Sequence, residues 1–247
     1  MANIVKKGKP YFRALKNIMR VRYKPTRFVF LGRPFENGSL ILSNHEGTDA
    51  PMALEMYLDK PMRMWGAHEM NSGLIPMYSY QSKVYFHEKK HWNIHLSRLF
   101  CLIASPLTNL FYSGFDLIST YRDIRFATTI KESLAAIREG KSIVVFPEHS
   151  EKGYLSELEG FFEGFALFAE HCARKGVDLP IIVSYFQVEK NTYIFDEPIL
   201  YSVLVEAYGE RKNIVSHLCD RCNALGKMDA DDIEERKRKE AEASLPA

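Results

Sequence analysis

The stretch Leu179-Pro180-Ile181-Ile182-Val183-Ser184-Tyr185-Phe186 decides the fold class of this chain. This nearly continuous apolar run, rich in β-branched residues, is typical of a strand buried on both faces of a parallel sheet. A second such run, Ser142–Phe146, ends at Pro147 and follows a predicted helix over Phe126–Ile137, which Gly140 ends. Strands that alternate with helices in this way predict an α/β fold with a central, mostly parallel sheet flanked by helices.

The same patterning extends to both sides of these segments. Further strands are predicted at Arg27–Leu31, Ser39–Ser43, Met62–Gly66 and Tyr193–Phe195, the first two on either side of the turn Asn37-Gly38. A helix is predicted over Phe161–Arg174. We therefore expect one α/β domain over residues 27–207, preceded by a basic segment over 1–26 and followed by a charged helical tail over 208–247.

The composition excludes several classes of protein. The chain has 247 residues, of which 46% are hydrophobic and 26% are charged, as in ordinary globular proteins and unlike disordered or fibrous ones. Four scattered cysteines, among them the lone pair Cys219 and Cys222, predict a reducing compartment and no disulfide framework. No uninterrupted apolar run reaches about 18 residues, and no apolar region of a signal peptide stands near the N-terminus, so neither a simple spanning helix nor a signal peptide is expected.

Positive charge is concentrated at the N-terminus. Residues 1–30 hold nine cations and no acid, so the remaining 33 − 9 = 24 cations face 31 acids. Within residues 1–26, apolar positions recur at helical spacing with cations beside them: Phe12, Leu15 and Met19, and Arg13, Lys16 and Arg20. The pattern predicts a basic amphipathic helix that faces an anionic membrane surface. Docking on the protein's own acidic surface is the alternative, and nucleic acid is not expected because no motif for it is present.

The segment Leu96–Ile118 is rich in Leu, Phe and Ile, and Pro106 divides it. We predict two apolar helices in a hairpin. Such a hairpin is either part of the core or a hydrophobic cap that dips into a membrane.

A candidate catalytic histidine follows the strand Ser39–Ser43. His45 stands directly after that strand, and the carboxylates of Glu46 and Asp49 follow within about one helical turn. A carboxylate on the second ring nitrogen fixes the tautomer of a histidine and stabilises its charged form, as general base catalysis requires. We expect an Asp49 carboxylate oxygen within hydrogen-bond reach of the His45 ring. The alternative is a polar loop histidine, with Asp49 capping a helix that holds Pro51 in its first turn.

Two further polar groups are expected at the same edge of the sheet. Glu148, His149 and Ser150 follow the strand Ser142–Phe146, and Arg122 stands just before the helix that leads into this strand. Because the carboxyl ends of parallel strands share one edge of a sheet, His45, Arg122 and Glu148 are expected to converge there.

Four blocks carry a family resemblance, listed in order: Asn44-His45 with Asp49, Leu117–Arg122, Phe146-Pro147-Glu148, and Leu179–Val183. In order and spacing they resemble the glycerolipid acyltransferase family typified by lysophosphatidic acid acyltransferase, and Gly66–Met70 resembles a further family segment. The chain departs from the family pattern in three places. Three residues instead of four separate His45 from Asp49, His149 replaces a glycine, and Ser150-Glu151 stand where the family commonly has an arginine. An insertion at about residues 87–115 precedes Arg122.

The resemblance implies transfer of a fatty acyl group from an acyl thioester, acyl-CoA or acyl carrier protein, to a hydroxyl of a lysophospholipid or glycerol-phosphate acceptor. It implies His45 as the general base and Asp49 as its orienting carboxylate. It implies substrate-binding roles for Arg122 on the acceptor phosphate and for Glu148, His149 and Ser150. No metal or other cofactor is expected, and the protein is expected at the cytoplasmic face of the membrane as a peripheral enzyme.

Two alternatives remain open at this point. The first is a lipid-binding relative of the family that has lost catalysis, which the shortened spacing favours. The second is a zinc hydrolase, because His87-Glu88-Lys89-Lys90-His91 matches the H-E-x-x-H signature. The longer metzincin form of the motif fails, since Ile94 and Ser97 stand where glycine and a third histidine are required.

Overall fold

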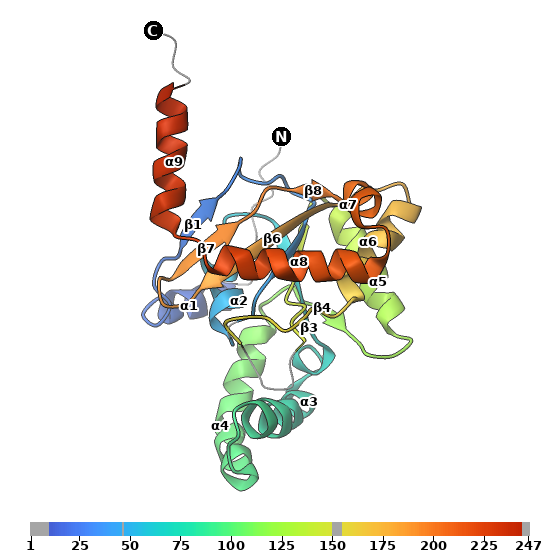
Figure 1. Cartoon of the computed structure of the whole chain (residues 1–247). Coiled ribbons are helices and arrows are strands. Elements are labelled where there is room, and N and C mark those ends of the chain that lie inside the picture. The colour runs from blue at the N-terminus through green and yellow to red at the C-terminus, as the bar shows by residue number, and fades with distance from the viewer. Residues whose placement is uncertain (1–9, 46, 150–154, 244–247) are drawn as a thin grey trace.

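The computed structural model describes residues 10–45, 47–149 and 155–243. In these residues eight strands form one sheet, in the order β1-β7-β6-β2-β5-β3-β4, with β8 paired to β6 (Figure 1). Their bounds are β1 Arg27–Phe30, β2 Leu40–Ser43, β3 Met62–Ala67, β4 Ile118–Thr120, β5 Ser142–Val145, β6 Pro180–Gln187, β7 Thr192–Phe195 and β8 Ile199–Leu200.

The sheet is mixed but mostly parallel. The five neighbouring strands from β6 to β4 all run in one direction, whereas β7 and β8 pair with β6 in the antiparallel sense. The predicted α/β class is therefore confirmed. The strands on either side of Asn37-Gly38 do not pair with each other, because β7 and β6 lie between β1 and β2.

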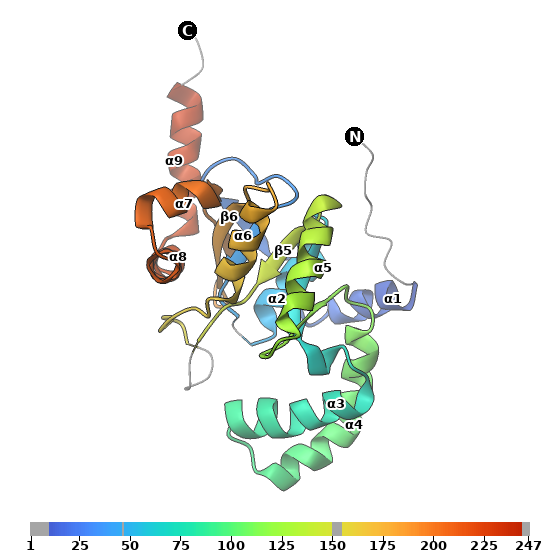
Figure 2. The ribbon, with the colours of Figure 1, turned by 90° about the vertical axis from the view of Figure 1, so that its right-hand side faces the viewer.

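Helices cover both faces of the sheet (Figures 1 and 2). Their bounds are α1 Pro10–Met19, α2 Asp49–Tyr57, η1 His68–Met70, α3 Leu74–Ser79, the π-helix η2 Tyr80–Lys89, α4 Ile94–Tyr112, α5 Phe126–Arg138, α6 Gly164–Arg174, α7 Tyr201–Tyr208, α8 Arg211–Gly226 and α9 Ala230–Ala243. Alternate residues of β2, β5 and β6 point to opposite faces, as strand geometry requires. One face packs on α5, α6, α7 and α8, and the other on α1 and α2.

The chain after residue 207 contributes to the core, which the sequence did not predict. Helix α8 buries Ile214, Leu218 and Cys222 in the cluster that packs on the sheet. Cys219 and Cys222 are buried thiols of this helix, as expected of structural residues. Helix α9 buries Ala230 and Ile233 of its first turn in the same cluster and then extends away from the body (Figure 1). The predicted charged tail is thus limited to α9, because α8 carries an apolar face.

The predicted hairpin within Leu96–Ile118 is wrong. The segment forms one helix, α4, with Pro106 in its interior. The missing amide of a proline removes one intrahelical hydrogen bond but need not end a helix that packs along its whole length. Helix α4 packs on α3 and η2, so its hairpin partner is the preceding segment and not its own second half (Figure 2).

Helix α1 uses its apolar side inside the protein. The Phe12 ring is buried against Phe111 and Phe115, with ring centroids 5.3 and 5.4 Å away. The Lys16 ammonium lies 3.1 Å from a Glu55 carboxylate oxygen. The apolar face that was predicted to meet a membrane therefore meets the domain itself, while Arg13 and Arg20 remain exposed.

Candidate active site

The predicted polar residues lie along one edge of the sheet. His45 follows β2, Glu148 follows β5 and Arg122 follows β4, and these strands are parallel. In the order β2-β5-β3-β4, Glu148 belongs to the strand next to that of His45. Arg122 is three strands away from β2, which corresponds to about 14 Å at the usual spacing between strands. This edge of the sheet therefore carries an imidazole (His45), a carboxylate (Glu148) and a guanidinium (Arg122) in one row.

A short hydrogen bond joins His45 to Glu148. The backbone amide of His45 donates to Oε1 of Glu148 at 2.6 Å, across 103 positions of sequence. Glu148 is itself held by a bridge to Phe161, and the amide of Phe162 donates to the carbonyl of Pro147 at 2.7 Å. The carboxylate of Glu148 thus fixes the backbone of the histidine loop, which differs from the substrate contact that the resemblance implies.

The residue before the histidine anchors the loop from the other side. Asn44 is fully buried, accepts a hydrogen bond from the amide of Phe186 at 2.7 Å and donates to the carbonyl of Phe186 at 3.0 Å. These two bonds attach the loop to the end of β6. His45 is therefore placed by two neighbouring strands, β6 through Asn44 and β5 through Glu148.

The predicted hydrogen bond between Asp49 and His45 is not formed among the described residues. Asp49 is the first residue of α2, and Gly47 takes a positive φ of 68° in the turn before it. The Oδ1 atom of Asp49 is buried and has no hydrogen-bond partner in the described part of the chain, and Nη2 of Arg22 lies 3.9 Å from it. The roles of His45 and Asp49 as a catalytic pair stay predictions, and Glu46 lies outside the described residues.

Burial and a nearby cation keep the imidazole neutral. Burial, followed by the positive charge of Lys89, lowers the pKa of His45 to about 4, and hydrogen bonding with the backbone at Gly47 opposes this effect only in part. The ring also packs on Phe146, with centroids 5.0 Å apart. At neutral pH the His45 ring is therefore uncharged and able to accept a proton.

The positive charge of Lys89 acts on His45, which the sequence did not reveal. Lys89 ends η2, and its charge acts on His45 while the charges of Glu148 and Arg122 act on it. Burial is the main cause that lowers the pKa of Lys89, opposed by the Glu148 carboxylate. In the H-E-x-x-H match this lysine is only a variable position, and its place near His45 follows from the packing of α3, η2 and α4.

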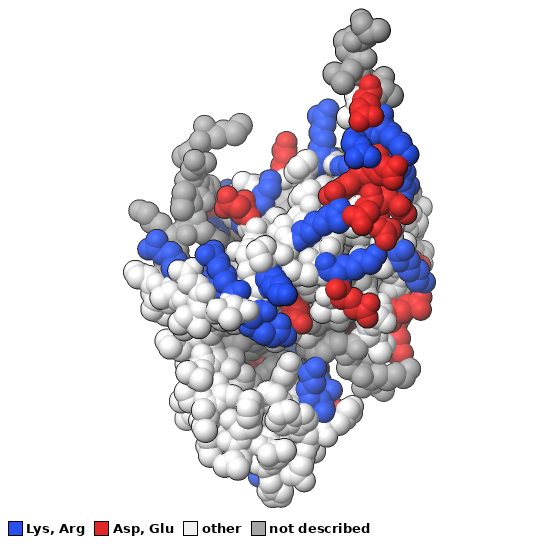
Figure 3. All heavy atoms as spheres, turned by 90° about the vertical axis from the view of Figure 1, so that its left-hand side faces the viewer, with Lys and Arg blue, Asp and Glu red and all other residues white. Residues whose placement is uncertain are grey.

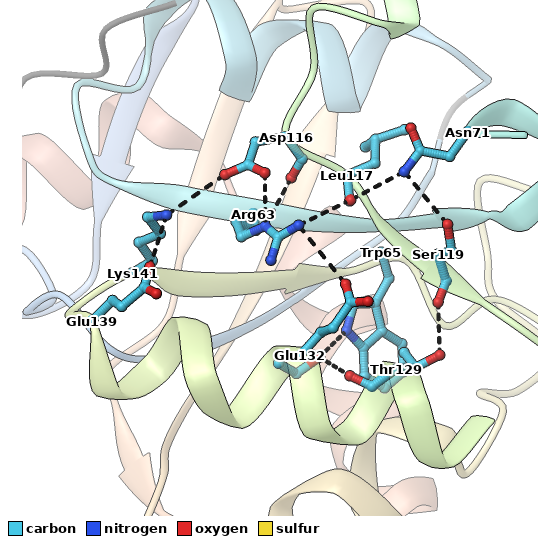
Figure 4. A network of polar contacts seen from close by, with 11 residues as sticks. Arg63, Trp65, Asn71, Asp116, Leu117, Ser119, Thr129, Glu132, Glu139 and Lys141 are labelled. Atoms are coloured by element: carbon cyan, nitrogen blue, oxygen red, sulfur yellow. Dashed lines mark hydrogen bonds and ion pairs between the residues drawn. The ribbon is translucent and has the colours of Figure 1, made fainter. Parts of the chain in front are cut away.

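Arg122 is exposed and is held at the edge by the short strand β4. A polar network secures that strand: Arg63 donates to the carbonyl of Leu117 at 3.2 Å, and Thr129 donates to the carbonyl of Ser119 at 2.7 Å (Figure 4). Asn71 also donates to Leu117 at 3.3 Å. These bonds connect β4 to β3 and α5, so the position of Arg122 depends on buried and half-buried partners on both sides.

Of the two other predicted substrate residues, only His149 lies in the described part of the chain. His149 is exposed, its ring packs edge-on against Phe162 with centroids 4.6 Å apart, and its amide donates to the carbonyl of Gly160 at 2.9 Å. Ser150 lies outside the described residues. The predicted contact of His149 with substrate stays a prediction.

The H-E-x-x-H match does not have the geometry of a zinc site. Helix η2 ends at Lys89, and His91 takes a left-handed conformation with φ of 56° beyond it. His87 and His91 therefore do not share one α-helical face, which that motif requires. Among the described residues, no group of three His, Cys, Asp or Glu side chains is placed to hold a metal ion.

The chain is similar to known proteins in structure but not detectably in sequence. No protein-family model and no curated protein matches the chain. Among solved structures, it is similar to the 1-acyl-sn-glycerophosphate (LPA) acyltransferase PlsC from Thermotoga maritima, at 10% sequence identity and a TM-score of 0.46. The match covers 92% of this chain and 79% of that one.

Proposed function

We propose that this protein is an acyltransferase that moves a fatty acyl group from an acyl thioester to a hydroxyl of a lysophospholipid or glycerol-phosphate acceptor. The observation that carries the proposal is the 2.6 Å bond between the His45 amide and Glu148, which joins two sequence motifs that resemble the same family. The donor in this proposal is acyl-CoA or acyl carrier protein, and the product is phosphatidic acid when the acceptor is its lysolipid.

In the proposed reaction, His45 is the general base. A ring nitrogen takes the proton of the acceptor hydroxyl while that oxygen attacks the thioester carbonyl. The new carbon–oxygen bond forms, the carbon–sulfur bond breaks, and the imidazolium returns the proton to the leaving thiolate. No other group has to form a covalent bond, so the chain contributes proton transfer and positioning.

The low pKa of His45 suits this role in one respect and limits it in another. A neutral imidazole is ready to accept a proton, but a base whose pKa is far below the working pH is weak. An anionic acceptor phosphate between Arg122 and Lys89 would counter the charge of Lys89, which lowers the pKa of His45. Binding of a phosphorylated acceptor is therefore expected to strengthen the base at the moment it is needed.

Asp49 orients the imidazole in this proposal. Since the bond between the two side chains is not formed in the structure, the loop at Gly47 must rearrange when substrate binds. That unformed bond is also the observation that favours the second candidate function, a lipid-binding protein of the same fold that has lost catalysis.

A screen of purified protein with acyl-CoA and a panel of lysophospholipid and glycerol-phosphate acceptors separates the two candidates. We expect an acylated product by mass spectrometry that His45→Ala abolishes. Glu148→Gln, which keeps an accepting oxygen, should retain more activity than Glu148→Ala. Binding of acceptor with no product from any donor–acceptor pair would instead support the lipid-binding alternative.

A further inference from the structure

Helix α4 exposes its large apolar side chains. Leu99, Ile103 and Leu107 are 66%, 75% and 66% exposed. Further exposed apolar residues continue this face along the helix: Leu96, Phe100 and Leu110. Their spacing at three, four and seven residues places them on one side of α4 for its whole length. We call this row the α4 apolar face.

The opposite side of α4 is built from small residues. Ser97, Cys101 and Ser105 recur every four residues, are fully buried, and belong to the side that packs on α3 and η2. The Ser105 hydroxyl donates to Oε1 of Gln81 at 2.7 Å across this contact. A helix on a water-exposed surface turns its large apolar residues toward the protein core. Small residues and hydroxyl hydrogen bonds at the contact between helices are instead typical of helices whose outer side meets lipid.

Cations lie beside one end of this face. Tyr11 of α1 forms a hydrogen bond of 2.8 Å with Ser113, directly after α4, and Phe12 packs on Phe111 near the end of α4. Three exposed cations belong to α1 and the segment that follows it: Arg13, Arg20 and Lys24. Figure 3 shows the lower lobe of this side of the molecule largely without charged side chains, with Lys and Arg gathered above it.

Among the described residues, α4 is the one helix long and apolar enough to cross a membrane by length and composition. Its large exposed apolar residues lie on the side turned away from α3 and η2, however, while the other side packs on these two helices. A one-sided apolar helix flanked by cations lies in the plane of the membrane interface, whereas a spanning helix is apolar on all sides that meet lipid.

We propose that the α4 apolar face, with the cations of α1 beside it, docks this protein on an anionic bilayer surface, with α4 lying in the interface. Charge complementarity favours this occupant, since residues 10–26 carry cations and no acid. The lobe formed by α3, η2 and α4 begins after the carboxyl end of β3 and ends before β4 (Figure 1). Docking of α4 therefore brings the sheet edge that holds His45 toward the lipid. The proposal stands on the exposure of α4 and does not depend on acyl transfer.

The test is co-sedimentation of the full chain with phosphatidylcholine vesicles, with and without phosphatidylserine. We expect binding to the vesicles that contain phosphatidylserine, weakened by salt because the Debye length falls from about 10 Å at 0.1 M to about 3 Å at 1 M. The double variant Leu99→Ser with Ile103→Ser should bind the vesicles at least about tenfold more weakly, because two large apolar side chains are no longer there to be buried in the membrane interface.

A matched pair of substitutions on another helix is the control. Val203 and Val205 of α7 are 44% and 40% exposed, and Val203→Ser with Val205→Ser should leave vesicle binding unchanged. Replacing Arg13, Arg20 and Lys24 by Glu should remove the preference for phosphatidylserine. Lys16 is left intact in that variant because it pairs with Glu55.

Two results would overturn the proposal. One is unchanged vesicle binding of the Leu99 and Ile103 variant. The other is a dimer in solution that the same variant dissociates, which would make the α4 apolar face a contact between two copies. Transfer from acyl-CoA to a soluble short-chain acceptor, measured without vesicles, reports on the proposed function separately, so either proposal can fail alone.

Discussion

The depressed pKa of His45 predicts a loss of stability in mild acid. The pKa of His45 falls from its ordinary value of 6.5 to about 4 in the folded protein, because the ring is buried and lies near Lys89. The unfolded chain therefore binds a proton at His45 at a pH where the folded chain does not, and stability decreases as the pH falls from about 6.5 to about 4. One pKa unit corresponds to about 1.4 kcal/mol, so the loss is about 3 kcal/mol across this range.

Urea denaturation at a series of pH values measures this effect, with His45→Asn as the reference that cannot titrate. The free energy of unfolding of the wild type should fall by about 3 kcal/mol more than that of the variant between pH 7 and pH 4. Lys89→Met removes the nearby positive charge that helps to lower the pKa of His45, so it should make this loss of stability smaller. Lys90→Met should leave the loss unchanged. Parallel pH profiles of the wild type and His45→Asn would refute the burial of this ring as the cause.

Two further predictions concern contacts that place the site. Asn44→Ala should lower the free energy of unfolding by about 2–4 kcal/mol in urea denaturation, because the amide and the carbonyl of Phe186 lose their partner in a buried position. A change below about 1 kcal/mol would show that these two hydrogen bonds contribute little to stability. Gly114→Ala should detach α1 and speed its removal by limited proteolysis, since the new Cβ would overlap the Phe12 ring. Gly160→Ala meets no atom within 4 Å and should be cleaved at the wild-type rate.

The sheet was predictable from the sequence because its strands are short apolar runs with clear ends. The segments Ser142–Phe146 and Leu179–Phe186 became β5 and β6, and Gly140, with φ of 75°, ends α5 as predicted. The topology then placed His45, Glu148 and Arg122 at one edge. The periodicity of apolar residues predicts which side chains are buried, and parallel pairing predicts which strand ends lie at the same edge of the sheet.

Features that depend on tertiary packing were not predictable. The apolar pattern of α4 is the same whether its large residues face a core or solvent, and only the structure shows that Ser97, Cys101 and Ser105 are the buried ones. Lys89 enters the site through the π-helix η2, whose irregular turn has no pattern in sequence. The contact of Glu148 with the His45 amide depends on backbone positions that residue types do not determine.

Thiol release from acyl-CoA, measured in the presence and absence of a lysophospholipid acceptor, shows whether His45 is the general base of acyl transfer from a thioester. We expect thiol release that requires the acceptor. His45→Ala should reduce it by a factor of about 100 or more, and His171→Ala, on α6, should leave it unchanged. Release that continues at the wild-type rate in His45→Ala would show that His45 is not the general base.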